Sequence, residues 1–144
     1  RPLDVELERL TCIQGSILSL PFSDGEVSSL SCLHVAEHIG LGRYGDELDP
    51  AGTVKAAREL SRVLAPGGRL LFALPVGRPR VEFNAHRIHA PDAIPEMFDQ
   101  LILSEFAGVD DTGRFRRWRA IDELSECSYG CGMFDLRKPG NDDA

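Results

Sequence analysis

Two histidines and a glutamate stand close together in the segment His34-Val35-Ala36-Glu37-His38. The spacing H-x-x-E-H is that of inverted zinc proteases, in which both histidines hold the metal and the glutamate lies between them. That chemistry requires one continuous helix with both histidines on one face. Because His34 closes an apolar run typical of a strand, we expect no metal at this segment, and a zinc hydrolase remains a minor alternative.

A glycine-rich run follows directly, and Gly40-Leu41-Gly42-Arg43-Tyr44-Gly45 matches the pattern G-x-G-x-x-G. A dinucleotide-binding loop must lead straight from a strand into a helix, whereas here several residues intervene on both sides. The acidic run 46–49 would also repel a pyrophosphate. We therefore expect the glycines to shape a lid or substrate loop that carries Arg43 and Tyr44, with a plain surface loop as the alternative.

A third polar group, formed by Asn84, His86 and Arg87, follows a later apolar run. Arginine binds carboxylates and phosphates in a fixed fork, so an anionic group on a ligand would account for Arg87. The alternative is that the arginine and the histidine are exposed on a connecting hairpin. The sequence leaves both interpretations open.

The run 114–119 interleaves aromatic residues with four arginines, a composition that suits RNA. Acidic residues surround it at Asp110, Asp111, Asp122 and Glu123, which favours a solvated face with local ion pairs. The formal net charge of −7 also opposes binding to a phosphate backbone. We expect no nucleic-acid partner.

The four cysteines do not have disulfide-rich spacing. Cys12 and Cys32 fall in expected strands, where free thiols behave as small buried hydrophobic groups. Cys127 and Cys131 are four positions apart, which is not the tight spacing of a zinc knuckle, and their role stays open.

These residues are positioned by a strand, a crossover helix and a second strand within residues 28–77. The apolar run 29–35 predicts the first strand. A helix is expected from Gly52, because Val54, Ala57, Leu60 and Val63 recur at helical spacing and Pro66-Gly67-Gly68 stops it. The run 70–74 is apolar without alternation, as in a strand covered on both faces, so the unit is expected to be parallel and right-handed.

The remaining segments extend this alternation of strands and helices. We expect a strand at 10–15, a loop or short strand at 76–89, a helix at 91–98, a strand at 101–109, a helix or loop at 121–127 and a strand at 129–137. This order predicts an α/β layered sheet. Ligands bind such sheets beyond the carboxyl ends of the strands, which directs attention to the residues after Gly15, Leu33 and Leu74.

Length and composition are those of one globular domain, which we place at residues 1–138, with a polar tail at 139–144. Of the 144 residues, 42% are hydrophobic. No apolar run approaches the roughly 20 residues of a membrane span, and no signal peptide is visible at the start. We expect a cytoplasmic protein with no membrane span.

Three regions resemble class I S-adenosylmethionine-dependent methyltransferases in both order and spacing. They are Gln14 to Gly25, Leu33 to Ile39 and Arg58 to Gly68. The runs 37–46 and 83–87 are also similar to a narrower methyltransferase-like family of unknown function. The resemblance covers nearly the whole chain and is strongest between Gly15 and Arg87.

The resemblance implies a three-layer Rossmann-like α/β sheet of which this chain supplies strands three to seven of seven. The glycine-rich donor loop and the acid that grips the ribose would precede Arg1, so the chain is expected to be a fragment that is incompetent alone. Because the missing strands would lie between the third and the fourth, we expect either a displaced segment at 11–14 or exposed sheet edges.

The resemblance also implies roles for individual residues, with S-adenosylmethionine as the cofactor and methyl donor. Ser16 and Ile17 would lie beside its adenine, and Cys32, Leu33 and His34 would border its methionine part. The acceptor would contact Arg43, Tyr44, Asn84 and Arg87. His38, Glu37 and His86 are the candidates for catalysis, with His38 as base or substrate hydrogen bond; alternatively, Glu37 and His38 only brace the following loop.

The acceptor is not identified by these residues, and a small molecule or glycan is one class that suits them. A non-catalytic methyltransferase-shaped binding or scaffold module is the alternative function. Its support is Ser16, which stands where many relatives place an aspartate that accepts the adenine amine.

Overall fold

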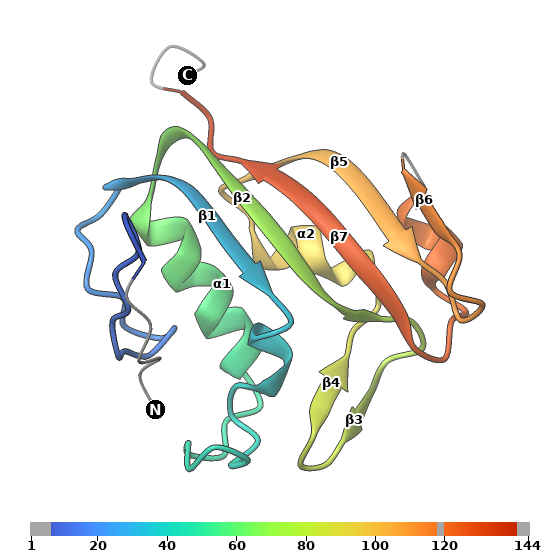
Figure 1. Ribbon diagram of the computed structural model, residues 1–144. Coiled ribbons are helices and arrows are strands. Elements are labelled where there is room, and N and C mark those ends of the chain that lie inside the picture. Colours follow the sequence, from blue (N-terminus) through green and yellow to red (C-terminus); the bar gives the residue numbers. More distant parts are fainter. Residues whose placement is uncertain (1–6, 118–119, 141–144) are drawn as a thin grey trace.

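The computed structural model describes residues 7–117 and 120–140. Within these residues the strands are β1 (Val27–Leu33), β2 (Leu64–Val76), β3 (Arg80–Glu82), β4 (His86–Ile88), β5 (Ile102–Val109), β6 (Phe115–Arg117) and β7 (Gly130–Arg137). The helices are α1 (Gly52–Val63) and α2 (Ala93–Met97), with 3-10 turns η1 (Ala36–His38) and η2 (Ile121–Leu124). Five of these strands form one sheet in the order β1-β2-β7-β5-β6, while β3 and β4 pair in a separate hairpin (Figure 1).

The predicted strand, helix and strand unit is confirmed. β1 and β2 are parallel, with Cys32 opposite Phe72, and α1 connects them. α1 begins at Gly52 as expected, and its buried residues Ala57, Leu60 and Val63 recur at helical spacing. β7 then lies antiparallel between β2 and β5. The sheet is therefore mixed, with its one parallel pair at the β1 edge.

The strand expected at residues 10–15 is wrong. This segment has no strand structure, and its side chains are exposed, including the Cys12 thiol that we expected to be buried. Among the described residues β1 is the edge strand of the sheet, and the segment does not pair with it. Of the two expected alternatives, a displaced segment or exposed sheet edges, the structure has exposed edges. The described strands of the sheet are paired without a gap.

Several boundaries also differ from expectation. β2 begins at Leu64, directly after α1, because the backbone becomes extended before Pro66 and not after it. The segment 76–89 forms the whole β3–β4 hairpin, and 121–127 contains only the short turn η2. The division into a domain at 1–138 and a tail at 139–144 stays a prediction. Residues 141–144 of that tail lie outside the described part of the chain.

The arginine-rich run is an exposed edge strand, β6, as far as it is described. Arg117 pairs with Glu105 at 3.7 Å, an acid on the neighbouring strand rather than one of the acids that flank the run in sequence. Trp118 and Arg119 lie outside the described residues.

The described helices cover one face of the sheet, so the expected three layers are not all formed by these residues. Both α1 and α2 pack on the buried face, in a core that contains Leu60, Phe72, Phe98 and Phe134. On the other face Leu71 is 39% exposed in the middle of β2. β2 is thus covered on one face only over this stretch.

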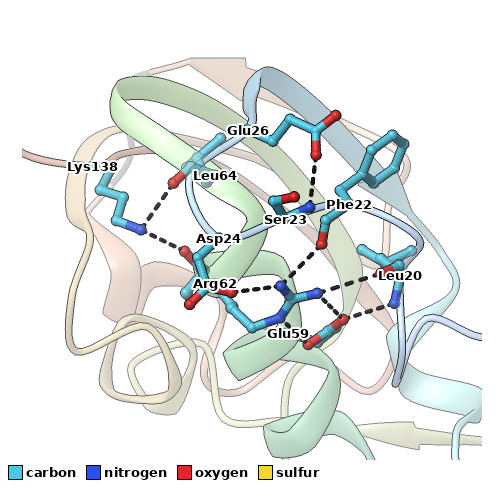
Figure 2. A network of polar contacts seen from close by, with 10 residues as sticks. Leu20, Phe22, Ser23, Asp24, Glu26, Glu59, Arg62, Leu64 and Lys138 are labelled. Carbon is cyan, nitrogen blue, oxygen red and sulfur yellow. Dashed lines mark hydrogen bonds and ion pairs between the residues drawn. The ribbon is translucent and has the colours of Figure 1, made fainter.

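The loop before β1 is fastened to α1 by a polar network (Figure 2). The Arg62 guanidinium donates to the backbone oxygens of Phe22 at 3.0 Å and Leu20 at 3.3 Å, and it pairs with Asp24 and Glu59 at 2.7 Å each. The Glu59 carboxylate also accepts the Leu20 amide at 2.7 Å. The end of α1 therefore fixes the chain that enters β1.

In the part of the chain described here, no helix has the length and apolar character needed to cross a bilayer.

Candidate functional site

The carboxyl ends of β1 and β2 form a common rim. Leu33 pairs with Ala73, and the His34 amide extends the ladder by donating to the Ala73 oxygen at 2.8 Å. Cys32 points into the core, where burial raises the pKa of its thiol to about 11. It is a packing residue, as expected, and the neighbouring Leu33 is 56% exposed at the rim.

His34 leaves the strand in a left-handed conformation with φ of 54°, which is uncommon for any residue but glycine. Its ring reaches across β2 to β7, where Nε2 lies 3.4 Å from Sγ of Cys131. On the other side of the ring, Nδ1 lies 3.2 Å from Oε1 of Glu37. The ring is thus held between a thiol and a carboxylate.

Glu37 is 1% exposed, although a carboxylate is rarely buried so completely. Its Oε1 faces both His34 and His38, at 3.2 and 3.7 Å from their ring nitrogens. Its Oε2 has no hydrogen-bond partner among the described residues. A buried carboxylate oxygen without a partner is costly, so this group is either a source of strain or part of the site's chemistry.

His38 belongs to a group of rings between the rim and the β3–β4 hairpin. Its Nδ1 lies 2.6 Å from the Ala85 oxygen, which requires the proton on Nδ1. Its ring is edge-on to Tyr44 and to His86, at centroid distances of 5.9 and 6.4 Å, and His86 in turn contacts Tyr129 at 5.2 Å. Three of the sequence-predicted site residues, Tyr44, His38 and His86, are therefore neighbours.

The glycine-rich loop between η1 and α1 is ordered by Asp46. The carboxylate of Asp46 accepts the amides of Gly40 at 2.5 Å and Tyr44 at 3.3 Å. Arg43 and Tyr44 are exposed at the tip of the loop, with the guanidinium 5.8 Å from the tyrosine ring. The loop itself contains no helix for a dinucleotide, and its role as a substrate loop stays a prediction.

Arg87 fastens this loop through its guanidinium, and its contact with an acceptor stays a prediction. Its guanidinium is buried and donates to the backbone oxygens of Ile39, Gly40 and Asp49, the last at 2.8 Å. Burial lowers the pKa of Arg87, although the nearby Asp49 acts in the opposite direction. Asn84 is exposed at the turn of the hairpin, so the two predicted acceptor contacts stand in different environments.

His89 is a residue that the sequence analysis did not single out. Burial lowers the pKa of His89 to about 4, and the charge of Arg87 adds to that effect. Its Nε2 is buried, and no described residue forms a hydrogen bond with it. It lines a hollow of about 580 Å³ between the hairpin and the loop, together with Leu48, Val81 and Phe83. Its position within an ordinary polar run gave no sequence signal.

Ser16 and Ile17 lie in a turn ahead of the Leu20 to Asp24 loop. The Ser19 amide donates to the Ser16 oxygen at 3.0 Å, and the Ser16 hydroxyl accepts the Leu18 amide at 3.2 Å. Ile17 packs against the core, while Ser16 is exposed. No hydrogen bond within residues 7–117 and 120–140 joins Ser16 to the rim at His34.

A second hollow, of about 420 Å³, lies over the open face of the sheet. His34 and Cys131 line one part of it, with Leu33, Ala73 and Met133 beside them. Sequence reasoning left Cys131 without a role, because 97 positions separate it from His34 and only the sheet order brings them together.

The geometry required by the zinc-hydrolase alternative is not present. His34 precedes the turn η1 and His38 ends it, so the two rings do not share one face of a continuous helix. Within the described part of the chain, no group of three or more potential ligands is arranged to hold a metal ion. The arrangement at the rim is suited to hydrogen bonding and proton transfer between side chains.

The fold is that of class I S-adenosylmethionine-dependent methyltransferases. A [4+2]-cyclase, SpnF, superposes with a TM-score of 0.61 at 18% identity over 91% of this chain, which covers 56% of that chain. An N-methyltransferase, NodS from Bradyrhizobium japonicum, gives 0.54 at 18% identity over 87% of this chain and 52% of its own. Geranyl diphosphate methyltransferase gives 0.58 at 14% identity over 86% of this chain and 56% of its own.

This chain therefore spans only about half the length of these three solved structures. No curated protein matches it in sequence. A family model does match, over residues 24–112, a region that contains the rim, the glycine-rich loop, α1 and the hairpin. The chain belongs to the family described as Caenorhabditis protein of unknown function, DUF268.

Proposed function

We propose that this chain is the acceptor side of an S-adenosylmethionine-dependent methyltransferase domain, and that the complete activity belongs to the gene product that contains it. The observation that carries the proposal is the parallel β1–β2 unit of the methyltransferase fold, which ends beside the buried carboxylate of Glu37. When bound, the donor supplies an electrophilic methyl group on a positively charged sulfonium.

The residues at the rim suit such a donor. Leu33 offers exposed apolar surface to the methylene chain beside the sulfonium, and the unpaired Oε2 of Glu37 places a negative group near the rim that favours a cation. The backbone from Cys32 to His34 would border the methionine part. Ser16 and Ile17 remain the proposed contacts of the adenine.

The protein's own contribution to methyl transfer is alignment and the removal of a proton. Methyl transfer is an in-line displacement, so most of its acceleration comes from holding the two reactants in register. His38 has its Nδ1 proton committed to Ala85, which leaves Nε2 free to take a proton from an acceptor hydroxyl or amine. Glu37, 3.7 Å from that nitrogen, would stabilise the cation that forms.

The surroundings of His38 favour a small-molecule or glycan-type acceptor. Tyr44 and Tyr129 are 72% and 52% exposed, and their rings flank His38 and His86. A tyrosine ring combines an apolar face with a polar tip, which suits a hydroxyl-rich molecule. Arg87 is occupied by the loop, so Arg43 is the arginine here that would reach an anionic group on the acceptor.

Calorimetry on the gene product that contains this chain tests the proposal. We expect S-adenosylmethionine and S-adenosylhomocysteine to bind at one common site with micromolar affinity, while ATP gives no heat. The Leu33→Asn variant should weaken donor binding at least about tenfold, because it places an uncharged polar group against the apolar part of the donor. No binding at millimolar donor would contradict the proposal and favour the non-catalytic scaffold.

A further inference from the structure

A thiol, an imidazole and a carboxylate stand in line at the rim. The Sγ of Cys131 lies 3.4 Å from Nε2 of His34, and Nδ1 of the same ring lies 3.2 Å from Oε1 of Glu37. The three residues come from β7, from the residue after β1 and from η1. The line thus depends on the whole fold and not on one local segment.

Two features of this line of residues are unfavourable for the stability of the folded protein. The left-handed backbone of His34 is unfavourable for a residue with a side chain, and the ring of this residue lies against Cys131. Glu37 is buried with Oε2 unpartnered, which costs further free energy. Strain of this kind is concentrated at functional sites.

The hydrogen-bond pattern fixes the direction in which a proton would move. A carboxylate accepts from Nδ1 of His34, so the imidazole carries its proton there and Nε2 is the acceptor. The thiol of Cys131 faces that acceptor. This is the order of groups that activates a nucleophile: a base within reach of it, and a third group that orients the base.

The thiol also has a space in front of it. Cys131 and His34 line the hollow of about 420 Å³ on the open face, beside Leu33, Ala73 and Met133. Arg69 and Arg117, at another part of the same hollow, are paired with Asp135 at 2.8 Å and Glu105 at 3.7 Å. A neutral, largely apolar molecule matches this lining.

We propose that Cys131 is a nucleophilic thiol that forms a covalent bond with an electrophilic carbon of a small apolar ligand, with His34 as its proton acceptor and Glu37 as the residue that positions His34. Sγ forms a bond to the carbon, the bond from that carbon to its leaving group breaks, and the leaving group departs with the electron pair. The thiol proton passes to Nε2 of His34. The proposal does not depend on donor binding, so each can fail without the other.

Burial alone predicts that the Cys131 thiol is a slow nucleophile. Burial, with the charge of Glu37 second, raises the pKa of the Cys131 thiol and so reduces the fraction present as thiolate. Cys12 is exposed. Without proton transfer to His34, Cys131 would react more slowly than Cys12; with it, Cys131 reacts faster.

Alkylation by iodoacetamide in the absence of any donor separates these two cases. The rate at each of the four cysteines is followed by peptide mass spectrometry at neutral pH, in native protein and in protein unfolded by urea. In the native protein we expect Cys131 to react at least about tenfold faster than Cys12, as a general base typically provides. In urea we expect similar rates at both.

Two variants test the partners. His34→Asn should slow Cys131 at least about tenfold and leave Cys12 unchanged, because asparagine tolerates the left-handed backbone but cannot take the proton. Glu37→Gln, which keeps a hydrogen-bond acceptor without the charge, should slow Cys131 less. Circular dichroism checks that both variants are folded.

A Cys131 that reacts no faster than Cys12 in the native protein would overturn the proposal. A fast Cys131 that is unaffected by His34→Asn would overturn it as well, since the base would then lie elsewhere. An unchanged rate in a folded Glu37→Gln protein would overturn the part assigned to Glu37.

Discussion

Arg87 is the side chain that ties the glycine-rich loop to the hairpin. It is buried and donates to three backbone oxygens, on Ile39, Gly40 and Asp49. Replacing it by methionine should therefore destabilise the fold by about 3 kcal/mol, because buried carbonyl groups lose their donors. Urea unfolding followed by circular dichroism measures this. Arg43→Met, on the exposed tip of the same loop, is the matched control and should change stability little.

His89 should make stability depend on pH. Its pKa is about 4 in the folded state against 6.5 for a free histidine, so between these values the unfolded chain binds a proton that the native protein does not. This contribution is fully present above pH 6.5 and is lost as the pH falls toward 4. At about 1.4 kcal/mol per pKa unit, its upper limit is about 3 kcal/mol.

The His89→Gln variant isolates this effect, because glutamine does not titrate. Unfolding free energies of both proteins at pH 7 and pH 4.5 give the difference. We expect the wild-type protein to lose more stability than the variant over that interval. Equal losses would show that His89 is not protected from protonation.

Site residues could be predicted from the sequence where they stand close together along the chain. The spacing of His34, Glu37 and His38 singled out the residues that meet at the rim. Two assignments could not be made locally. The partners of Arg87 lie 38 to 48 positions earlier in the chain, and Cys131 meets His34 only because β2 separates their strands. Such contacts depend on sheet order, which residue patterns do not contain.

The loop that enters β1 depends on one arginine of α1. Arg62 bonds the oxygens of Leu20 and Phe22, and its hydrogen bond holds the pKa of Glu59 below its usual range (Figure 2). In the Arg62→Met variant the amides of Leu20 and of residues 22–25 should exchange at least about tenfold faster, as local opening becomes easier. Hydrogen exchange with mass spectrometry measures this. Arg58→Met, at an exposed position of the same helix, should leave those amides unchanged.

Gly40 and Gly45 form a matched pair within the glycine-rich loop. Both have positive φ, 78° and 83°, but a Cβ on Gly40 would collide with the Asp49 oxygen, whereas a Cβ on Gly45 meets nothing within 4 Å. Gly45→Ala should therefore cost only the backbone strain, about 1 kcal/mol, and Gly40→Ala about 2 kcal/mol more. Thermal unfolding of both variants checks the difference. Equal costs would mean that the loop yields freely at Asp49.

Elements with a buried face were predicted well, and those without one were not. The helical spacing of Ala57, Leu60 and Val63 located α1, since those residues pack on the sheet. The run 10–15 has strand-forming residues but no neighbouring strand, so it stays irregular and exposed. The short strands β3 and β6 are exposed, and β4 buries only Arg87 and Ile88, so their pairing comes from the turns that join them rather than from hydrophobic periodicity.

In the described residues α1 and α2 lie on one face of the five-stranded sheet (Figure 1). The other face carries the hollow beside His34 and Cys131. The methyltransferase fold and the DUF268 family follow from the comparisons. The place of the donor is the claim on which the account depends.

The claim that the donor binds at the rim is tested most directly by nuclear magnetic resonance. The gene product that contains this chain is labelled with nitrogen-15 and titrated with S-adenosylhomocysteine. We predict saturable shifts of the backbone amides of Cys32, Leu33, His34 and Glu37, with smaller changes on β5 and β6 at the far side of the sheet. Saturable shifts confined to other regions, or none at millimolar ligand, would contradict the account.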